Sequence, residues 1–166
     1  MTNFKNKDAL YIAYAAVIAA IYVVLTLIFA PISYGPVQVR VSEALCVLPI
    51  FTPAAVPGIF IGCLLANAFG GAMIWDVVFG SLASLLAAYI SYFFRDKKVL
   101  AYLSPIVINA LVVPFVLKYA YGAEDMIWYM MITVGIGEVI SVGILGSLLS
   151  VSYTHLRAHE TVLDLV

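Results

Sequence analysis

The sequence contains few charged residues, few histidines and few cysteines, and each shortage excludes a class of protein. Only 10% of the 166 residues are charged, while 65% are hydrophobic. An ordinary soluble domain is about a quarter charged, and a soluble globule of this length could not bury so much apolar surface. The two histidines, His155 and His159, lie close to the end of the chain. Neither is therefore placed to act within the apolar part of the sequence.

Common enzyme signatures are also missing. The chain has no H-E-x-x-H motif, no G-x-S-x-G motif and no phosphate-binding loop, because no glycine is followed by lysine. Cys46 and Cys63 lack C-x-x-C spacing and lie in apolar segments, so we predict small buried residues and neither a disulfide nor a metal pair. We predict a protein that is not an enzyme and that uses no cofactor, no metal and no nucleic-acid partner.

The sequence does contain repeated apolar runs that reach or approach the roughly 20 residues needed to cross a bilayer as a helix. The first run follows Lys5 and Lys7 and is too long for the apolar core of a signal peptide. We predict an all-α integral membrane protein of the cell membrane, a compact bundle of six transmembrane helices over residues 1–150. The predicted spans are 9–30, 37–50, 54–69, 74–94, 99–119 and 126–149.

Positive charge and parity predict the topology. The lysines before the first span and the basic loop at 95–98 are both expected in the cytoplasm, and two cytoplasmic points require an even number of crossings between them. The short segment 37–50 is therefore counted as a crossing, which places both termini in the cytoplasm. The intervening stretch 31–36, in which two prolines flank Tyr34 and Gly35, is predicted to be a loop.

Six polar residues interrupt the apolar segments and are the predicted substrate-binding residues. A charge at bilayer depth costs roughly 2.5–3.5 kcal/mol and persists mainly where it faces protein or a water-filled cavity. On the predicted topology all six lie in the outer half of the bundle, which indicates a pocket that is open to the outside and closed below. They are Arg40, Glu43, Asn67, Asp76, Asn109 and Glu138.

Several roles stay open at this point. Arg40 and Glu43 share a helix face, so they form either a structural ion pair or a ligand contact. The two asparagines either join helices or contact the ligand. The carboxylates outnumber Arg40, which favours a polar, cationic ligand, since carboxylates accept N–H bonds from an amidine-like edge or pair with an amine. Four aromatic residues form an interfacial belt or stack on a ligand ring: Tyr34, Trp75, Trp128 and Tyr129.

Alanines recur four residues apart along the first span. Small residues at this spacing allow another backbone to approach closely, which is typical of helix association in lipid. The face is either a docking surface for a partner subunit or an internal packing seam. Its residues are Ala9, Ala13, Ala15, Ala16, Ala19 and Ala20.

Two consecutive segments resemble a known family. QVRVSEALCVLPIFTPAAVPG and GIFIGCLLANAFGGAMIWDVVFGSLASLLAAY are similar to the QueT family, the queuosine precursor S components of energy-coupling factor (ECF) transporters. The resemblance covers about residues 5–150. It implies capture of a 7-deazaguanine such as preQ1 from outside, a transmembrane T subunit and two ATPase subunits as partners, docking through the alanine-rich face, and a pocket covered by the loop after the first helix. The alternatives are an S component for another small polar metabolite or vitamin, a membrane scaffold whose charges form internal ion pairs, and, least supported, a membrane enzyme.

The last segment, residues 151–166, differs in composition from the rest of the chain. It holds both histidines together with Arg157, Glu160 and Asp164. We predict a non-native or disordered tail, of the kind produced by translated adapter or read-through sequence.

Overall fold

The chain folds into a helical bundle, as predicted. The computed structural model describes the backbone of residues 2–33 and 38–163 and the side chains of residues 7–33 and 38–156, and these contain no strand. In chain order the elements are α1 (Thr2–Ile28), α2 (Ala30–Ser33), the 3₁₀-helix η1 (Val41–Ile50), α3 (Ala55–Phe69), α4 (Ile74–Phe93), α5 (Lys98–Ala120), α6 (Ile127–Glu138), the π-helix η2 (Val139–Leu145) and α7 (Gly146–Leu163).

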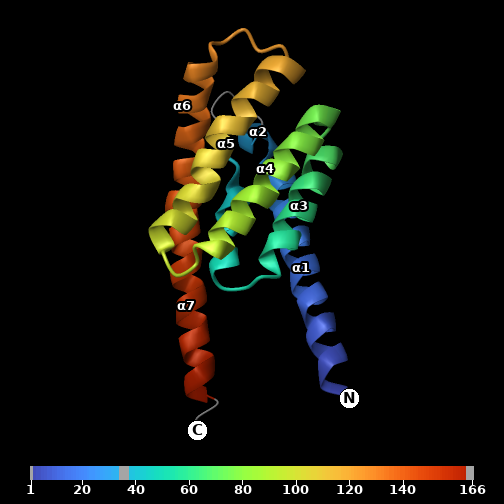
Figure 1. The fold of residues 1–166 in the computed structure, drawn as a ribbon, viewed down its shortest axis with the longest axis vertical. Coiled ribbons are helices and arrows are strands. Elements are labelled where there is room, and N and C mark those ends of the chain that lie inside the picture. Colours follow the sequence, from blue (N-terminus) through green and yellow to red (C-terminus); the bar gives the residue numbers. More distant parts are fainter. Residues whose placement is uncertain (1, 34–37, 164–166) are drawn as a thin grey trace.

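Successive long segments run in alternating directions along the bundle (Figure 1). The elements α6, η2 and α7 follow one another as a single rod on the side opposite α1, and α4 and α5 lie between them. The start of α1 and the end of α7 point to the same end of the molecule. This arrangement fits two termini on one side of a membrane, while the side itself stays a prediction.

Within the part of the chain that the structure describes, four helical segments are long and apolar enough to cross a bilayer: Lys7–Ile28, Ile74–Phe93, Lys98–Ala120 and Ile127–Leu156. The two remaining apolar helices, η1 and α3, are shorter. At about 2.0 Å of rise per residue in a 3₁₀-helix, η1 spans only ~20 Å of a hydrocarbon core that is about 30 Å thick. The all-helical fold is thus confirmed, with four candidate membrane spans in the described residues, and the count of six crossings stays a prediction.

Three helices, α3, α4 and α5, have ends within one residue of the predicted ranges, whereas the segments flanking the first loop differ. The 3₁₀-helix begins only at Val41, with Arg40 as its extended N-cap residue (φ −94°, ψ 99°). Residues Ala30–Ser33 form a helical turn where we predicted a loop. Pro31 is tolerated there because the N–H that proline lacks is unpaired in the first turn of any helix. Tyr34 lies outside the described residues.

The last predicted span does not end at residue 149. After the π-helix η2 the chain continues as α7 to Leu163, so the helix passes through the boundary that we placed at 150. Tyr153, in the predicted tail, packs against Phe51 with the ring centroids 4.7 Å apart and the ring planes tilted by 37°. The tail is therefore helical over its described part, and its non-native origin stays a prediction.

The alanines of α1 divide between two faces. Ala15 and Ala19 are buried, at 8% and 5% exposure. They lie against α3, because a Cβ atom at Gly58 would come within 2.8 Å of the Ala15 carbonyl oxygen, and one at Gly62 within 3.1 Å of the Ala19 Cα. These two alanines form an internal packing seam. The other four alanines are exposed: Ala9, Ala13, Ala16 and Ala20.

The distribution of polarity is the reverse of that in a soluble protein. Large apolar side chains cover the outside, and Phe93 and Val99 are 69% and 74% exposed. Charged and amide side chains lie inside, where Glu43 is 1% and Asn67 is 0% exposed. Because charged side chains are almost never fully buried without partners, these interior residues mark the candidate site.

Candidate functional site

The interior polar residues surround one small cavity, here called the polar cavity. Its walls come from η1, the extended segment before it, and helices α4, α5 and α6. Its volume is about 10 Å³, which is close to the space of a single water molecule. The lining residues are Gln38, Arg40, Glu43, Asp76, Gly80, Ser84, Asn109, Val113 and Glu138. Five of the six predicted substrate-binding residues therefore line the same cavity.

The sixth residue, Asn67, lies beside the cavity at the end of α3. Its Nδ2 donates to the Asp76 carbonyl oxygen at 3.5 Å, and the side chain is fully buried. The absence of a side chain at Gly80 permits this approach, since a Cβ atom there would lie 2.9 Å from Asp76 Oδ1 and 3.3 Å from Asn67 Nδ2. The predicted set is thus brought together from five helices and the segment that precedes η1.

The 3₁₀ geometry of η1 aligns Glu43 with its neighbours. Side chains three residues apart eclipse one another in a 3₁₀-helix, so Arg40, Glu43 and Cys46 lie in one row. Arg40 Nη1 is 4.0 Å from Glu43 Oε1, and Cys46 Sγ donates to Glu43 Oε2 at 2.8 Å. From α1, the Tyr22 hydroxyl donates to Glu43 Oε1 at 2.5 Å. The ion pair, one of the two roles left open for Arg40 and Glu43, is therefore present, and both carboxylate oxygens of Glu43 accept hydrogen bonds within the chain.

Asp76 is held from the far end of α5. The Tyr121 hydroxyl donates to Asp76 Oδ2 at 3.0 Å and accepts the backbone N–H of Met73 at 3.0 Å. Asp76 lies in the first turn of α4, where a carboxylate also interacts favourably with the helix dipole. One oxygen of this carboxylate is thus fixed by a residue that lies outside the predicted set.

Glu138 is joined to α5 through Asn109. The Asn109 Nδ2 donates to Glu138 Oε1 at 3.0 Å, and the two side chains are 3% and 5% exposed. The second oxygen, Glu138 Oε2, is buried and has no hydrogen-bond partner among the described residues; the same is true of Asn67 Oδ1. Glu138 is also the last residue of α6 before the π-helix η2, and π segments occur frequently at functional sites.

The sulfur atom of Cys63 lies close to three hydrogen-bond donors. Its Sγ lies 3.4 Å from Ser84 Oγ, 3.6 Å from Asn67 Nδ2 and 3.9 Å from Arg40 Nη1. The prediction that both cysteines are buried and unpaired is confirmed. The sequence did not indicate that their sulfur atoms belong to the polar network.

Two tyrosines of this network were also missed. Tyr22 is fully buried within α1, and Tyr121 follows α5. A signal for the first was available, because a buried tyrosine hydroxyl usually finds a hydrogen-bond partner. No spacing in the sequence connects Tyr121 with Asp76.

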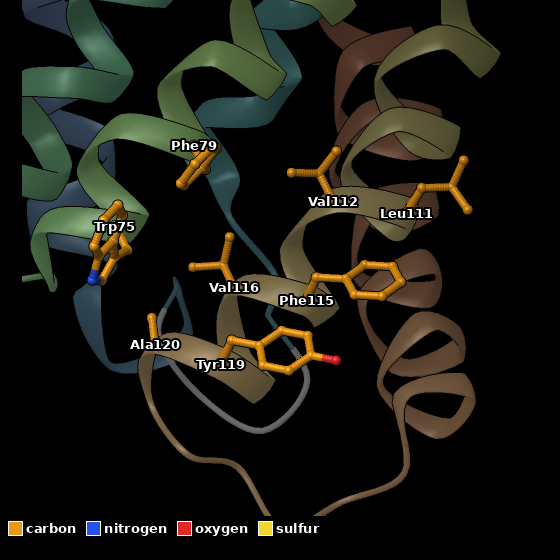
Figure 2. Close-up of a pocket in the computed structure, with 8 residues that line it drawn as sticks. All are labelled: Trp75, Phe79, Leu111, Val112, Phe115, Val116, Tyr119 and Ala120. Carbon is orange, nitrogen blue, oxygen red and sulfur yellow. The ribbon is translucent and has the colours of Figure 1, made fainter.

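A much larger hollow, here called the apolar groove, lies elsewhere on the bundle. It runs between α4 and α5 and has a volume of about 550 Å³. Figure 2 shows its lining residues on these two helices: Trp75, Phe79, Leu111, Val112, Phe115, Val116, Tyr119 and Ala120. None of the six predicted substrate-binding residues lines it. Trp75, Trp128 and Tyr129 are 50–60% exposed and none lines the polar cavity, which favours the interfacial position over ring stacking.

An apolar exterior, membrane-length helices and an enclosed polar cavity define an integral membrane protein with an internal polar site. The profile of the family described as "QueT transporter" matches residues 12–155. The chain belongs to the QueT transporter family, as the resemblance implied. It is a multi-pass protein of the cell membrane from a family of transporters, and it is not an enzyme.

A similar protein agrees with this placement. The "Queuosine precursor transporter QueT" of Lactococcus lactis subsp. cremoris (strain MG1363) is 34% identical over 99 residues. The aligned part covers 58% of this chain and 56% of that protein, so the match spans little more than half of either. No solved structure matches the chain.

Proposed function

We propose that this protein is the substrate-binding S component of an ECF importer and captures a queuosine precursor, a 7-deazaguanine such as preQ1, from outside the cell. Family membership supports transport, and the name of the L. lactis relative supports the substrate class. The polar cavity is the single observation that carries the proposal to particular residues. The proposal includes six crossings, with η1 and α3 as the two short ones and both termini in the cytoplasm.

The chemistry of the polar cavity suits such a ligand. Three carboxylates face one guanidinium, so the cavity has spare anionic capacity for a cation. A 7-deazaguanine ring presents N–H donors, and preQ1 adds a primary amine that is protonated at neutral pH. Hydrogen bonds between charged partners are roughly twice as strong as neutral ones, and they strengthen further where water is excluded. Glu43, Asp76 and Glu138 thus supply the charge, and Arg40, Asn67 and Asn109 complete the polar wall.

Ligand capture requires the polar cavity to widen, because about 10 Å³ does not hold a bicyclic base. The wall that belongs to no helix is the extended segment 38–40, which includes the lining residues Gln38 and Arg40. This segment lies directly against α6, since a Cβ atom at Gly137 would overlap the Gln38 carbonyl group. We propose that displacement of this segment admits the ligand.

The binding experiment uses the purified chain in detergent. We expect preQ1 to raise its melting temperature and Glu138→Ala to abolish that rise, because the variant removes a buried acceptor of the cavity. If only an unrelated vitamin or metabolite stabilised the protein, the substrate assignment would change, and the assignment as an S component would remain. If no small polar ligand stabilised the protein, a scaffold with internal ion pairs would be the better description.

Energy for transport must come from other subunits, because the chain has no phosphate-binding loop. The proposed partners are a transmembrane T subunit and two ATPase subunits. The proposed docking surface is the exposed alanine stripe of α1, which consists of Ala9, Ala13, Ala16 and Ala20. Small residues on this face would allow a partner helix to approach closely.

Docking is tested separately from binding. Replacing Ala16 and Ala20 by leucine should abolish co-purification with the T subunit while preQ1 still stabilises the variant. Val17→Leu is the matched control, because Val17 is exposed on the same helix but lies off the stripe. Retained co-purification of the double leucine variant would refute this surface.

A further inference from the structure

We propose that Glu138 is the specificity-determining residue for a primary ammonium group on the ligand, and that Asn109 positions its carboxylate for this contact. The inference rests on the proposed function, because it concerns precursors that carry an aminomethyl group on the 7-deazaguanine ring. It assigns distinct roles to carboxylates that composition alone cannot distinguish.

The three carboxylates of the polar cavity differ in what they already bind. Both oxygens of Glu43 accept hydrogen bonds within the chain, from the Tyr22 hydroxyl and from Cys46 Sγ. Asp76 accepts one from Tyr121. Glu138 alone combines near-complete burial with a carboxylate oxygen that lacks a donor among the described residues. A buried acceptor without a donor is unfavourable for folding, which points to a group kept for a ligand.

The number of available oxygens determines which donor fits. An amidine-like edge donates two parallel hydrogen bonds and requires both oxygens of one carboxylate. At Glu138, Oε1 already accepts from Asn109 Nδ2 at 3.0 Å, so a ring edge would have to share that oxygen with Asn109. An ammonium group is a compact charge that needs only one oxygen in a direct line. Glu138 Oε2 therefore suits an ammonium group better than the ring edge.

Asn109 is the positioning residue in this arrangement. It holds Oε1 from α5, which restricts rotation of the Glu138 carboxylate, while Oε2 has no donor among the described residues. Glu138 is also the residue at which α6 changes to the π-helix η2. Such local changes of helix geometry re-aim side chains and are common at functional sites.

The test compares two ligands that share a ring: 7-aminomethyl-7-deazaguanine (preQ1) and its 7-cyano analogue, which has no amine. Affinities are measured with the purified full chain in detergent. We expect the unmodified protein to prefer the amine by about tenfold or more, the range of one charge-assisted contact. Glu138→Gln retains the shape and should bring this ratio close to one, while affinity for the cyano analogue changes little.

Two further variants complete the design. Asn109→Ala should lower the ratio without a matching loss of affinity for the cyano analogue, a pattern that general destabilisation would not produce. Tyr22→Phe removes a donor to Glu43 and should lower the melting temperature of the free protein while the ratio stays unchanged. This control separates loss of structure from loss of selectivity.

An unchanged ratio in Glu138→Gln, or an equal weakening of both ligands, would overturn the inference and leave the proposed function intact. Loss of the ratio in Asp76→Asn but not in Glu138→Gln would also overturn it, by assigning the ammonium to the other carboxylate. Failure of the proposed function looks different, because neither 7-deazaguanine would bind the unmodified protein. That result would refute both the proposed function and the inference about Glu138.

Discussion

The polar cavity and the apolar groove are hollows of opposite kinds on the same bundle. The groove has a volume of about 550 Å³, and its walls are apolar side chains such as Leu111 and Phe115, 52% and 43% exposed. The polar cavity measures about 10 Å³ and contains Arg40, Glu43 and Glu138, each less than 10% exposed. The apolar groove is the kind of surface that lipid chains cover. The polar cavity holds the charged side chains that can bind a polar ligand.

The difference shows why volume is a poor guide to function in a membrane protein. Apolar grooves on the outside cost nothing in lipid, because hydrocarbon is as apolar as leucine. Buried charges are unfavourable wherever they occur in the bilayer. Several of them brought together from different helices therefore indicate a functional site. Substitutions in the two regions should therefore have effects of very different size.

The largest effect is expected at the ion pair of the polar cavity. Arg40→Met should lower the free energy of unfolding by about 3–5 kcal/mol, because it leaves the Glu43 charge buried beside two neutral donors, Tyr22 and Cys46. The double variant Arg40→Met/Glu43→Gln should be clearly more stable than the single one, since no unpaired charge remains. Melting of both variants in detergent measures the difference. Equal stability of the single and double variants would show that the pair is not coupled.

A medium effect is expected at the glycine that supports the cavity wall. A Cβ atom at Gly137 would overlap the Gln38 carbonyl, whereas one at Gly135, on the same helix, would meet only Ala110 Cβ at 3.7 Å. Gly137→Ala should therefore displace the segment 38–40, destabilise the protein by about 1–3 kcal/mol and weaken ligand binding. Gly135→Ala is the matched control and should have none of these three effects. Melting curves with and without ligand compare the two alanine variants, and similar curves would exclude a role for this wall.

Much of the site could be predicted from the sequence because of the bilayer. Glu138, Asn109 and Asp76 stand out in apolar segments where a polar group is unfavourable unless it faces protein. The spans of α4 and α5 were also predicted closely, since long apolar runs ended by short polar stretches leave few alternatives. The same reasoning located five of the nine residues that line the polar cavity.

The remaining features depend on tertiary geometry that no local pattern encodes. The 3₁₀ form of η1, which aligns Cys46 with Glu43, is one turn type among several that a short apolar segment with a proline can adopt. The Tyr121 contact with Asp76 joins residues 45 positions apart. The alanine spacing of α1 predicted two competing roles, and only the position of Gly58 and Gly62 showed that Ala15 and Ala19 form an internal seam.

The smallest effect is expected in the apolar groove. Leu111→Ala combined with Phe115→Ala removes two half-exposed apolar side chains that contact lipid or detergent in both the folded and the partly unfolded chain. Because hydrocarbon replaces what the substitution removes, we expect a change in unfolding free energy of only about 0.5 kcal/mol, typical of surface positions, and unchanged ligand binding. Binding and melting of this double variant, measured beside Glu138→Gln, complete the series. A loss of ligand binding here would move the site to the groove, because no residue of the polar cavity would have been altered.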